Sequence, residues 1–348
     1  MKIRYADAVG LATDLLLAVG YDRPKAAAVA RALGLAEAWG LSSHGLLRLP
    51  LYLDRTLAGG YDPDAELTTV TDLGALLVLD GATSLGHWQM SRAVELGTPR
   101  AKQFGIAAIA IGNSGHCGAL GVYAADAAEA GLVCLAFSCG PAVLPPWGGN
   151  QRLLSTSPIA AGFPLTPQPA IVDLALSTVA RGKIAAYANR KESLPEGWAL
   201  DAAGRPTTDP EEALLGMLSP LGGAKGFALA FLVEALTAGL VGPSLSKDMP
   251  DFFDQNSLGR PQGISHLLLL IDPATTDAGG DPEAALQRFA ALAAATDAAG
   301  GRVPGARRLA PSRIGPHLVV DVQDELLEGL RERQRATAPT ADGPTATP

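Results

Sequence analysis

Cysteine is scarce in this sequence, which has three in 348 residues and no CxxC pair. A small, odd number of cysteines argues against a disulfide framework. Histidine is also rare, with five in the chain, and no group of His, Cys, Asp or Glu has ligand spacing such as HExxH. We therefore expect neither a disulfide-stabilised domain nor a metal site.

Long apolar runs and basic clusters are missing as well. The richest apolar stretch, residues 227–241, is interrupted by Glu234 and Thr237 and falls short of the roughly 18 residues that span a membrane. The net charge is −8 and no basic run stands out, which argues against nucleic acid as a partner. The N-terminus lacks the apolar segment of a signal peptide, so we expect a cytoplasmic protein with no membrane partner.

The chain mixes helix and strand patterns without a steady βαβ period, which predicts an α/β fold with a mixed sheet. Helical periodicity dominates residues 4–58. Short apolar runs predict buried strands at residues 105–111, 132–137, 170–174 and 264–271.

We expect the chain to be organised in three parts. An N-terminal helical part, residues 1–70, is expected to pack with the C-terminal segment 305–335. Residues 71–304 are expected to form the main domain, with a helical insertion near 210–260. The Ala/Thr/Pro-rich end, residues 336–348, is expected to be disordered.

One histidine has an arginine and two serines as near neighbours, in the segment SSHGLLRLPLY of residues 42–52. His44 can exchange a proton near neutral pH, and Arg48 can bind a carboxylate through two hydrogen bonds. If the segment is helical, the i, i+4 spacing places both side chains on one face, and Ser43 is positioned to hydrogen-bond the imidazole. A surface His and Arg on a helix explains the spacing equally well.

A second histidine lies in a glycine-rich loop, GNSGHCGALG, at residues 112–121. Glycines let backbone N–H groups approach an anion, and the N-terminus of the following helix favours negative charge. His116 would lie at the rim of such a site. The loop is not a dinucleotide fingerprint, because no GxGxxG follows the first strand, and a flexible turn is the simpler interpretation of the loop alone.

Two further segments carry charged candidates. Asp173 lies near the end of a predicted strand, where it could orient a catalytic histidine or cap the next helix. Lys225, in the sequence GGAKG, could bind a phosphate together with free backbone N–H groups, or could be a solvated lysine in a tight turn. His87, His266 and His317 have no comparable context and are expected to be structural.

Together these segments resemble the malate/L-lactate dehydrogenase type 2 family. That family includes ureidoglycolate, sulfolactate and diketogulonate oxidoreductases and the Δ1-piperideine-2-carboxylate/Δ1-pyrroline-2-carboxylate reductases. The resemblance covers roughly residues 4–330. The segments that carry it, in the family's order, are SSHGLLRLPLY (42–52), GNSGHCGALGVYA (112–124), PPWGGNQRLLSTSPIA (145–160), VDLALSTVARGKI (172–184), PEGWALDAAGRPTTDP (195–210), GGAKGFALA (222–230) and RVPGARR (302–308).

The resemblance implies that residues 71–304 form a cofactor- and substrate-binding domain, which binds NAD(P) and is not of the Rossmann type. It also implies a homodimer with the active site at the subunit interface, and NADPH or NADH as the cofactor. By the family pattern His44 is the acid/base residue, assisted by Ser43 and Asp173, whereas some members use the histidine that matches His116 as proton acceptor. Arg48 matches the residue that binds the substrate carboxylate.

Other family positions map onto several loops of this chain. Thr156 matches a substrate contact. The residues that match cofactor contacts are His116, Cys117, Gly118, Ala119, Leu120, Asp173, Leu174, Ala175, Ser177, Lys225, Gly226, Arg302, Pro304, Gly305, Arg307 and Arg308. The family often has Glu where this chain has Ala306, and Arg307 and Arg308 could pair with a 2′-phosphate, which favours NADP.

We therefore expect an NAD(P)-dependent oxidoreductase that transfers a hydride between nicotinamide and C2 of a small 2-oxo acid or 2-hydroxy acid of the malate/lactate type. Its substrate is a small carboxylate. The alternative enzyme is a reductase of cyclic or N-alkyl imine-2-carboxylates. The alternative outside enzymes is a cofactor-binding protein that has lost catalysis, against which the presence of all the candidate catalytic side chains argues.

Overall fold

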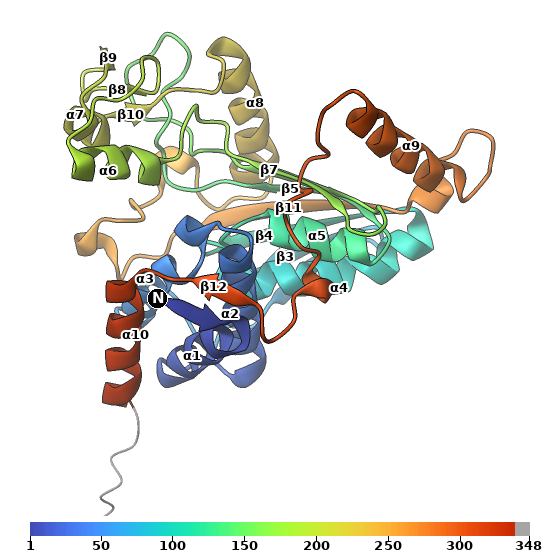
Figure 1. Ribbon diagram of the computed structural model, residues 1–348, viewed down its shortest axis with the longest axis horizontal. Helices are drawn as coiled ribbons and strands as arrows, with labels where there is room; N and C mark the ends of the chain where they lie inside the picture. The colour runs from blue at the N-terminus through green and yellow to red at the C-terminus, as the bar shows by residue number, and fades with distance from the viewer. Residues whose placement is uncertain (338–348) are drawn as a thin grey trace, which may run out of the picture.

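A seven-stranded sheet runs through the centre of the protein in the computed structural model, which describes residues 1–337 (Figure 1). Its strand order is β2-β3-β4-β11-β5-β6-β7, in which the β3–β4 pair is parallel and the other described pairs are antiparallel. The predicted α/β fold with a mixed sheet is confirmed. The strands are β2 (Thr68–Asp72), β3 (Leu76–Asp80), β4 (Ile106–Ser114), β5 (Val133–Ser138), β6 (Ile159–Phe163), β7 (Ala170–Leu174) and β11 (Ile264–Ile271).

Strand β11 is central because its sequence, ISHLLLLI, is apolar at successive positions and can be covered on both faces. Helices α4 (Gly86–Phe104) and α5 (Gly121–Glu129) cover one face of the sheet (Figure 1). On the other face, Phe137 and Leu267 pack in one core with Leu176 and Val233 from outside the sheet. The sheet is therefore a buried middle layer.

The N-terminal helices form a second core beside this sheet. They are α1 (Tyr5–Ala18), α2 (Arg23–Ala38) and α3 (Leu49–Leu57). The C-terminal helix α10 (Asp324–Thr337) packs on α1, and β1 (Lys2–Arg4) pairs antiparallel with β12 (Val319–Asp321). Of the tail predicted to be disordered, residues 336 and 337 instead continue α10, and residues 338–348 lie outside the described residues.

A smaller unit lies beside the main sheet (Figure 1). It consists of α6 (Arg181–Arg190), α7 (Pro210–Leu215), α8 (Ala224–Glu234) and a sheet of β8 (Ala199–Leu200), β9 (Pro206–Thr207) and β10 (Met217–Leu218). Helix α6 begins at Arg181, after Ser177 has formed a β-bridge with Pro220. Because α6 belongs to this unit, the unit begins before residue 210, the start expected for the helical insertion.

Helix α9 (Ala284–Ala298) lies far from this unit, near the β6–β7 edge of the sheet (Figure 1). No helix within residues 1–337 has the length and apolar character needed to cross a membrane. The same residues contain no cluster of three or more side chains suited to a metal ion.

Candidate active site

Two short 3-10 turns, Ser42–His44 and Leu46–Arg48, place the candidate histidine and arginine between α2 and α3. Gly45 separates the turns, so the segment is not the single helix on which the i, i+4 argument depended. The buried carboxylate of Glu37 holds both turns. It accepts hydrogen bonds from a serine hydroxyl of the first turn and a backbone N–H of the second, at 2.9 and 2.7 Å.

His44 is oriented by the residue before it. Ser43 Oγ lies 3.0 Å from His44 Nδ1, so the predicted serine–imidazole hydrogen bond is present, whereas Nε2 has no hydrogen-bond partner in the described chain. Burial, reinforced by the Arg48 charge, lowers the pKa of His44 to about 4. Arg48 Nε donates to Ser43 O at 2.8 Å, and its guanidinium lies over Phe253, 4.7 Å from the ring centroid. A titratable nitrogen and a cation therefore lie close together.

The glycine-rich loop brings His116 to the same place. Its ring lies nearly parallel to that of His44, with centroids 6.2 Å apart, and it stacks on Phe252 at 4.8 Å. Its Nδ1 lies 2.7 Å from the Tyr52 hydroxyl and 3.2 Å from the backbone nitrogen of Gly118. Burial lowers the pKa of His116 well below its usual value, and the neighbouring His44 adds to this shift.

Gly118 is required by the close packing of this loop. Its φ is +71°, and a Cβ there would lie 2.7 Å from His87 Nε2. His87 is fully buried beneath the loop, and neither ring nitrogen has a hydrogen-bond partner among residues 1–337. His266 is held between Ser138 and Ser114, at 2.9 and 3.1 Å, which fits the structural role expected for it. The other loop residues matched to cofactor contacts are buried in the main core: Cys117, Ala119 and Leu120.

Asp173, at the end of β7, faces helix α5 and not His44. Its Oδ2 lies 3.5 Å from Arg308 Nη1, and a Cβ on Gly121 would meet the same oxygen at 2.7 Å. Burial raises the pKa of Asp173, while Arg308 opposes that shift. Within residues 1–337 no hydrogen bond joins Asp173 to His44, and α6 has no side-chain cap. Inside this chain Asp173 therefore neither orients His44 nor caps the next helix, because its carboxylate is turned toward Arg308 and α5.

Three segments matched to substrate or cofactor contacts lie side by side. Leu176 N–H donates to Thr156 O, and Leu221 N–H donates to Leu176 O, both at 2.8 Å. This network joins the end of β7 to the start of α8, where Lys225 is exposed. Ser177 Oγ is buried beside this network and has no hydrogen-bond partner in the part of the chain that the structure describes. The remaining matched residues here are exposed Leu174, half-buried Ala175 and buried Gly226.

A separate group of matched residues lies in the loop 302–308, which comes after α9 in the sequence and lies beside the edge strand β7. Ile171 N–H donates to Pro304 O at 3.0 Å, which ties the loop to the strand. Arg308 points inward, and its buried Nη1 lies at ion-pair distance from a carboxylate but makes no hydrogen bond. Arg307 is exposed. The other matched residues are exposed Arg302 and half-buried Gly305.

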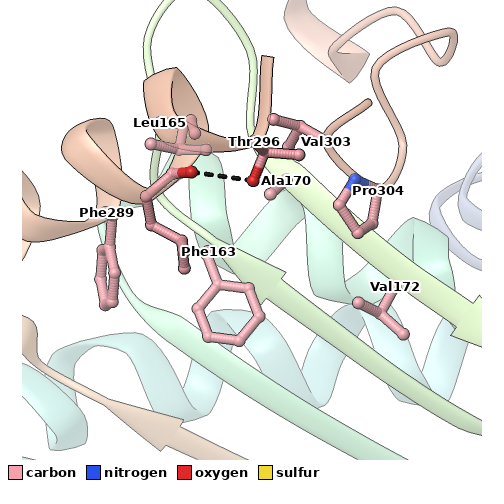
Figure 2. Close-up of a pocket in the computed structure, with 10 residues that line it drawn as sticks. Phe163, Leu165, Ala170, Val172, Phe289, Thr296, Val303 and Pro304 are labelled. Atoms are coloured by element: carbon pink, nitrogen blue, oxygen red, sulfur yellow. Dashed lines mark hydrogen bonds between the residues drawn. The ribbon is translucent and has the colours of Figure 1, made fainter. Parts of the chain in front are cut away.

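An apolar cavity of about 230 Å³ lies between β6, β7 and α9 (Figure 2). Its walls include Phe163, Val172, Phe289, Val303 and Pro304. The Thr296 hydroxyl at its edge is hydrogen-bonded to the Leu292 carbonyl at 2.8 Å (Figure 2). None of the candidate catalytic side chains lines this cavity, although Pro304 belongs to the loop 302–308.

Several residues of the site were not predicted from the sequence. Tyr52 lies inside the segment that drew attention to His44, but nothing in its spacing indicated that it would contact His116. Phe252 stacks on His116 from a segment without any sequence signal. Gln262 accepts a hydrogen bond from the His116 backbone N–H at 3.1 Å, and its Nε2 is buried without a partner.

Comparison with known proteins gives consistent matches along the chain. The family model described as malate/L-lactate dehydrogenase matches residues 3–331. The chain is 42% identical over 313 residues to (2R)-3-sulfolactate dehydrogenase (NADP(+)) of Chromohalobacter salexigens, covering 89% of this chain and 92% of that protein. It is 36% identical to Δ1-pyrroline-2-carboxylate reductase of Ancylobacter novellus, covering 88% and 90% of the two chains.

Solved structures give the same picture. Sulfolactate dehydrogenase from Methanocaldococcus jannaschii superposes with a TM-score of 0.87 at 26% identity, covering 97% of each chain. Δ1-piperideine-2-carboxylate reductase from Pseudomonas syringae superposes with a TM-score of 0.86 at 29% identity, covering 96% of this chain and 99% of that one. The similarity therefore spans the whole fold and includes both hydroxy acid dehydrogenases and imine reductases.

Proposed function

The chain belongs to the malate/L-lactate dehydrogenase family, and from this premise we propose that it interconverts a small 2-oxo acid and its 2-hydroxy acid. It is an NAD(P)-dependent oxidoreductase of the class that acts on 2-hydroxy acids or related imines. The proposal that the substrate is a 2-oxo acid or 2-hydroxy acid rests on the pair of His44 and Arg48, in which a proton-exchanging nitrogen lies beside a cation. We also propose a cytoplasmic location, which three unpaired cysteines favour.

In this proposal each side chain has one task. The terminal nitrogens of Arg48, which have no hydrogen-bond partner in the described chain, bind the substrate carboxylate. His44 gives a proton from Nε2 to the substrate oxygen during reduction and removes it during oxidation. Ser43 holds the opposite ring nitrogen and so fixes the direction of Nε2.

The matched residues fit a nicotinamide dinucleotide. Among residues 1–337, Ser177 Oγ and Arg308 Nη1 are buried without hydrogen-bond partners, as expected for groups that a ligand completes. Lys225 at the N-terminus of α8 adds positive charge beside free backbone N–H groups. When bound, the cofactor supplies or accepts the hydride. The chain's own residues hold the substrate and move the proton.

We favour a 2-oxo acid over an imine because of the similarity to the sulfolactate dehydrogenase, and we keep cyclic imine-2-carboxylates as the second candidate because of the similarity to the pyrroline-2-carboxylate reductase. The test is oxidation of NADPH or NADH with 3-sulfopyruvate, oxaloacetate, pyruvate, Δ1-piperideine-2-carboxylate, and pyruvate plus methylamine. Faster turnover with a ketone supports the proposal, and turnover with imines alone would replace it. No turnover together with cofactor binding would indicate a protein without catalysis.

Arg48→Ala is expected to raise KM about 10- to 100-fold, because the substrate carboxylate loses a charge-assisted fork of hydrogen bonds. It should also lower kcat, since a loosely held substrate does not keep its C2 atom aligned with the nicotinamide. Steady-state kinetics over a range of substrate concentrations measure both. Arg48→Lys is the matched control, because it keeps the charge without the fork and should fall between the two. An unchanged KM in Arg48→Ala would place the carboxylate elsewhere.

Cofactor preference gives a second prediction. Arg307 is exposed, whereas Arg308 is turned toward Asp173, so we propose that Arg307 is the residue that contacts a 2′-phosphate. Arg307→Ala is expected to reduce the ratio of kcat/KM for NADPH over NADH by about 5- to 10-fold. Arg307→Lys should retain most of the preference. An unchanged ratio in the alanine variant would remove Arg307 from the cofactor site.

We propose that the functional unit is a homodimer that buries helix α8. This helix is apolar on nearly every side, and Leu229, Phe231 and Leu232 are 45%, 57% and 48% exposed. Its one acidic residue, Glu234 at the C-terminal end, is buried and hydrogen-bonded to Ser246. A helix that is apolar all round is normally covered by other protein. In this proposal a second copy of the chain covers α8, and the active site then lies at the subunit interface.

Leu232→Glu is therefore expected to convert the dimer to a monomer at micromolar concentration and to reduce activity. Light scattering coupled to gel filtration measures the mass. Leu215→Glu is the control, because Leu215 is 75% exposed but lies on α7 and not on α8. A Leu232→Glu variant that keeps the mass of a dimer would exclude this face.

A further inference from the structure

The contacts of His116 determine which of its ring nitrogens carries the proton. The backbone nitrogen of Gly118 lies 3.2 Å from Nδ1 in hydrogen-bond geometry, and a backbone N–H can only donate. Nδ1 must therefore accept. A neutral imidazole carries its proton on the other nitrogen, so His116 is protonated at Nε2. It follows that the Tyr52 hydroxyl, 2.7 Å from Nδ1, is also a donor.

The surroundings of His116 disfavour a positive charge on its ring. The titratable and charged groups that face it are His44, His87, Arg48 and His266, none of which is negative. The ring is half-buried and stacked on an aromatic side chain. A second proton would have to enter at Nδ1, where it would face the Gly118 N–H, which can only donate. His116 is thus held neutral, with its Nε2 free of hydrogen-bond partners in the described chain.

We propose that Tyr52 and the Gly118 N–H fix His116 as a neutral hydrogen-bond donor that stabilises negative charge on the substrate's 2-oxo oxygen, while His44 alone exchanges the proton. The inference rests on the proposed function, because it assigns a role within that reaction. His116 keeps its Nε2 proton throughout. The proton that the oxygen gains during reduction comes from His44 Nε2. Tyr52 is a positioning residue in this scheme, since it acts through His116.

Nitrogen-15 spectra of the histidines test the tautomer without any substrate, so the result does not depend on whether the proposed function is correct. The chain has five histidines, and the signal of His116 is identified as the one missing from His116→Gln. We expect an unprotonated Nδ1, a protonated Nε2 and no titration between about pH 5.5 and 8.5. A proton on Nδ1, or titration in that range, would overturn the inference.

The role of Tyr52 is read from the same spectra. Tyr52→Phe removes one of the two donors to Nδ1, so the His116 nitrogen shifts should change, and the rarer tautomer or titration should become detectable. Tyr123→Phe is the matched control, because that hydroxyl also supports the loop but donates to the Cys117 carbonyl. It should leave the His116 signals in place. Equal spectral changes in both variants would show that Tyr52 supports the loop structurally and does not specifically fix the tautomer of His116.

Substitution of His116 itself separates a donor from an acid/base group. Glutamine keeps an N–H donor of similar reach but cannot exchange a proton, and leucine offers neither. We expect His116→Gln to retain turnover within about tenfold of the parent and His116→Leu to lose about 10²- to 10³-fold, as for other lost oxyanion donors. Equally low turnover in the two variants would show that His116 transfers a proton.

Discussion

His44→Ala is expected to lose about 10²- to 10⁴-fold in turnover, the contribution that general acid–base catalysis usually makes. The reason is that His44 Nε2 is a titratable nitrogen beside Arg48 and has no protein hydrogen-bond partner in the described chain. Cofactor binding should persist, because within the described residues the His44 side chain makes no hydrogen bond to the cofactor-matched segments 173–177, 225–226 and 302–308. Steady-state kinetics and calorimetry with NADPH measure the two properties. His317→Ala, at an exposed histidine, is the control.

The pH dependence follows from the same residue. The pKa of His44 is lowered to about 4, so the imidazole is neutral above about pH 5. Oxidation needs the neutral form, and its kcat/KM should be constant from about pH 5 to 8 and fall below that range. Reduction needs the protonated form, and its kcat/KM should rise as the pH falls toward 5. Turnover in His44→Ala similar to that of the parent would move the proton transfer to His116.

Arg55→Met is expected to lower the free energy of unfolding by at least about 3 kcal/mol. Arg55 is 0% exposed and lies under the segment 251–260. Its terminal nitrogens donate to the carbonyls of Asp251, Ser257 and Arg260, at 3.1, 3.3 and 3.3 Å. Methionine fills similar space but leaves these buried acceptors without a donor. Chemical denaturation measures the loss.

Two controls make this prediction specific. Arg55→Lys retains one donor group and should lose less stability than the methionine variant. Arg92→Met removes an arginine that is 52% exposed and paired with Glu95, so it should cost no more than about 1 kcal/mol. Because Arg55 also holds the segment that stacks Phe252 on His116, Arg55→Met should lower turnover as well. Unchanged stability would mean that the segment is held by other contacts.

Local chemistry was predictable wherever the relevant partners are neighbours in the chain. Ser43 precedes His44, so their hydrogen bond required only that both residues be ordered. Asp22 caps α2 by accepting from Lys25 N–H at 2.8 Å, a contact between residues only three apart in the sequence. The apolar run of residues 267–271 in β11 predicted a buried strand and hence a covered sheet. The family resemblance then supplied the class of reaction, which no local pattern identifies.

The arrangement of the site was decided by tertiary structure. Asp173 was a reasonable partner for His44 by residue type, but its side chain leaves β7 on the side of α5 and meets Arg308. Tyr52 contacts His116 because helix α3 packs against the loop after β4. The residue pattern within either segment does not predict that contact. Periodicity specifies which face of an element is buried. Which distant surface covers that face is set by the packing of the whole chain, and in this protein that packing determines how His116 is protonated.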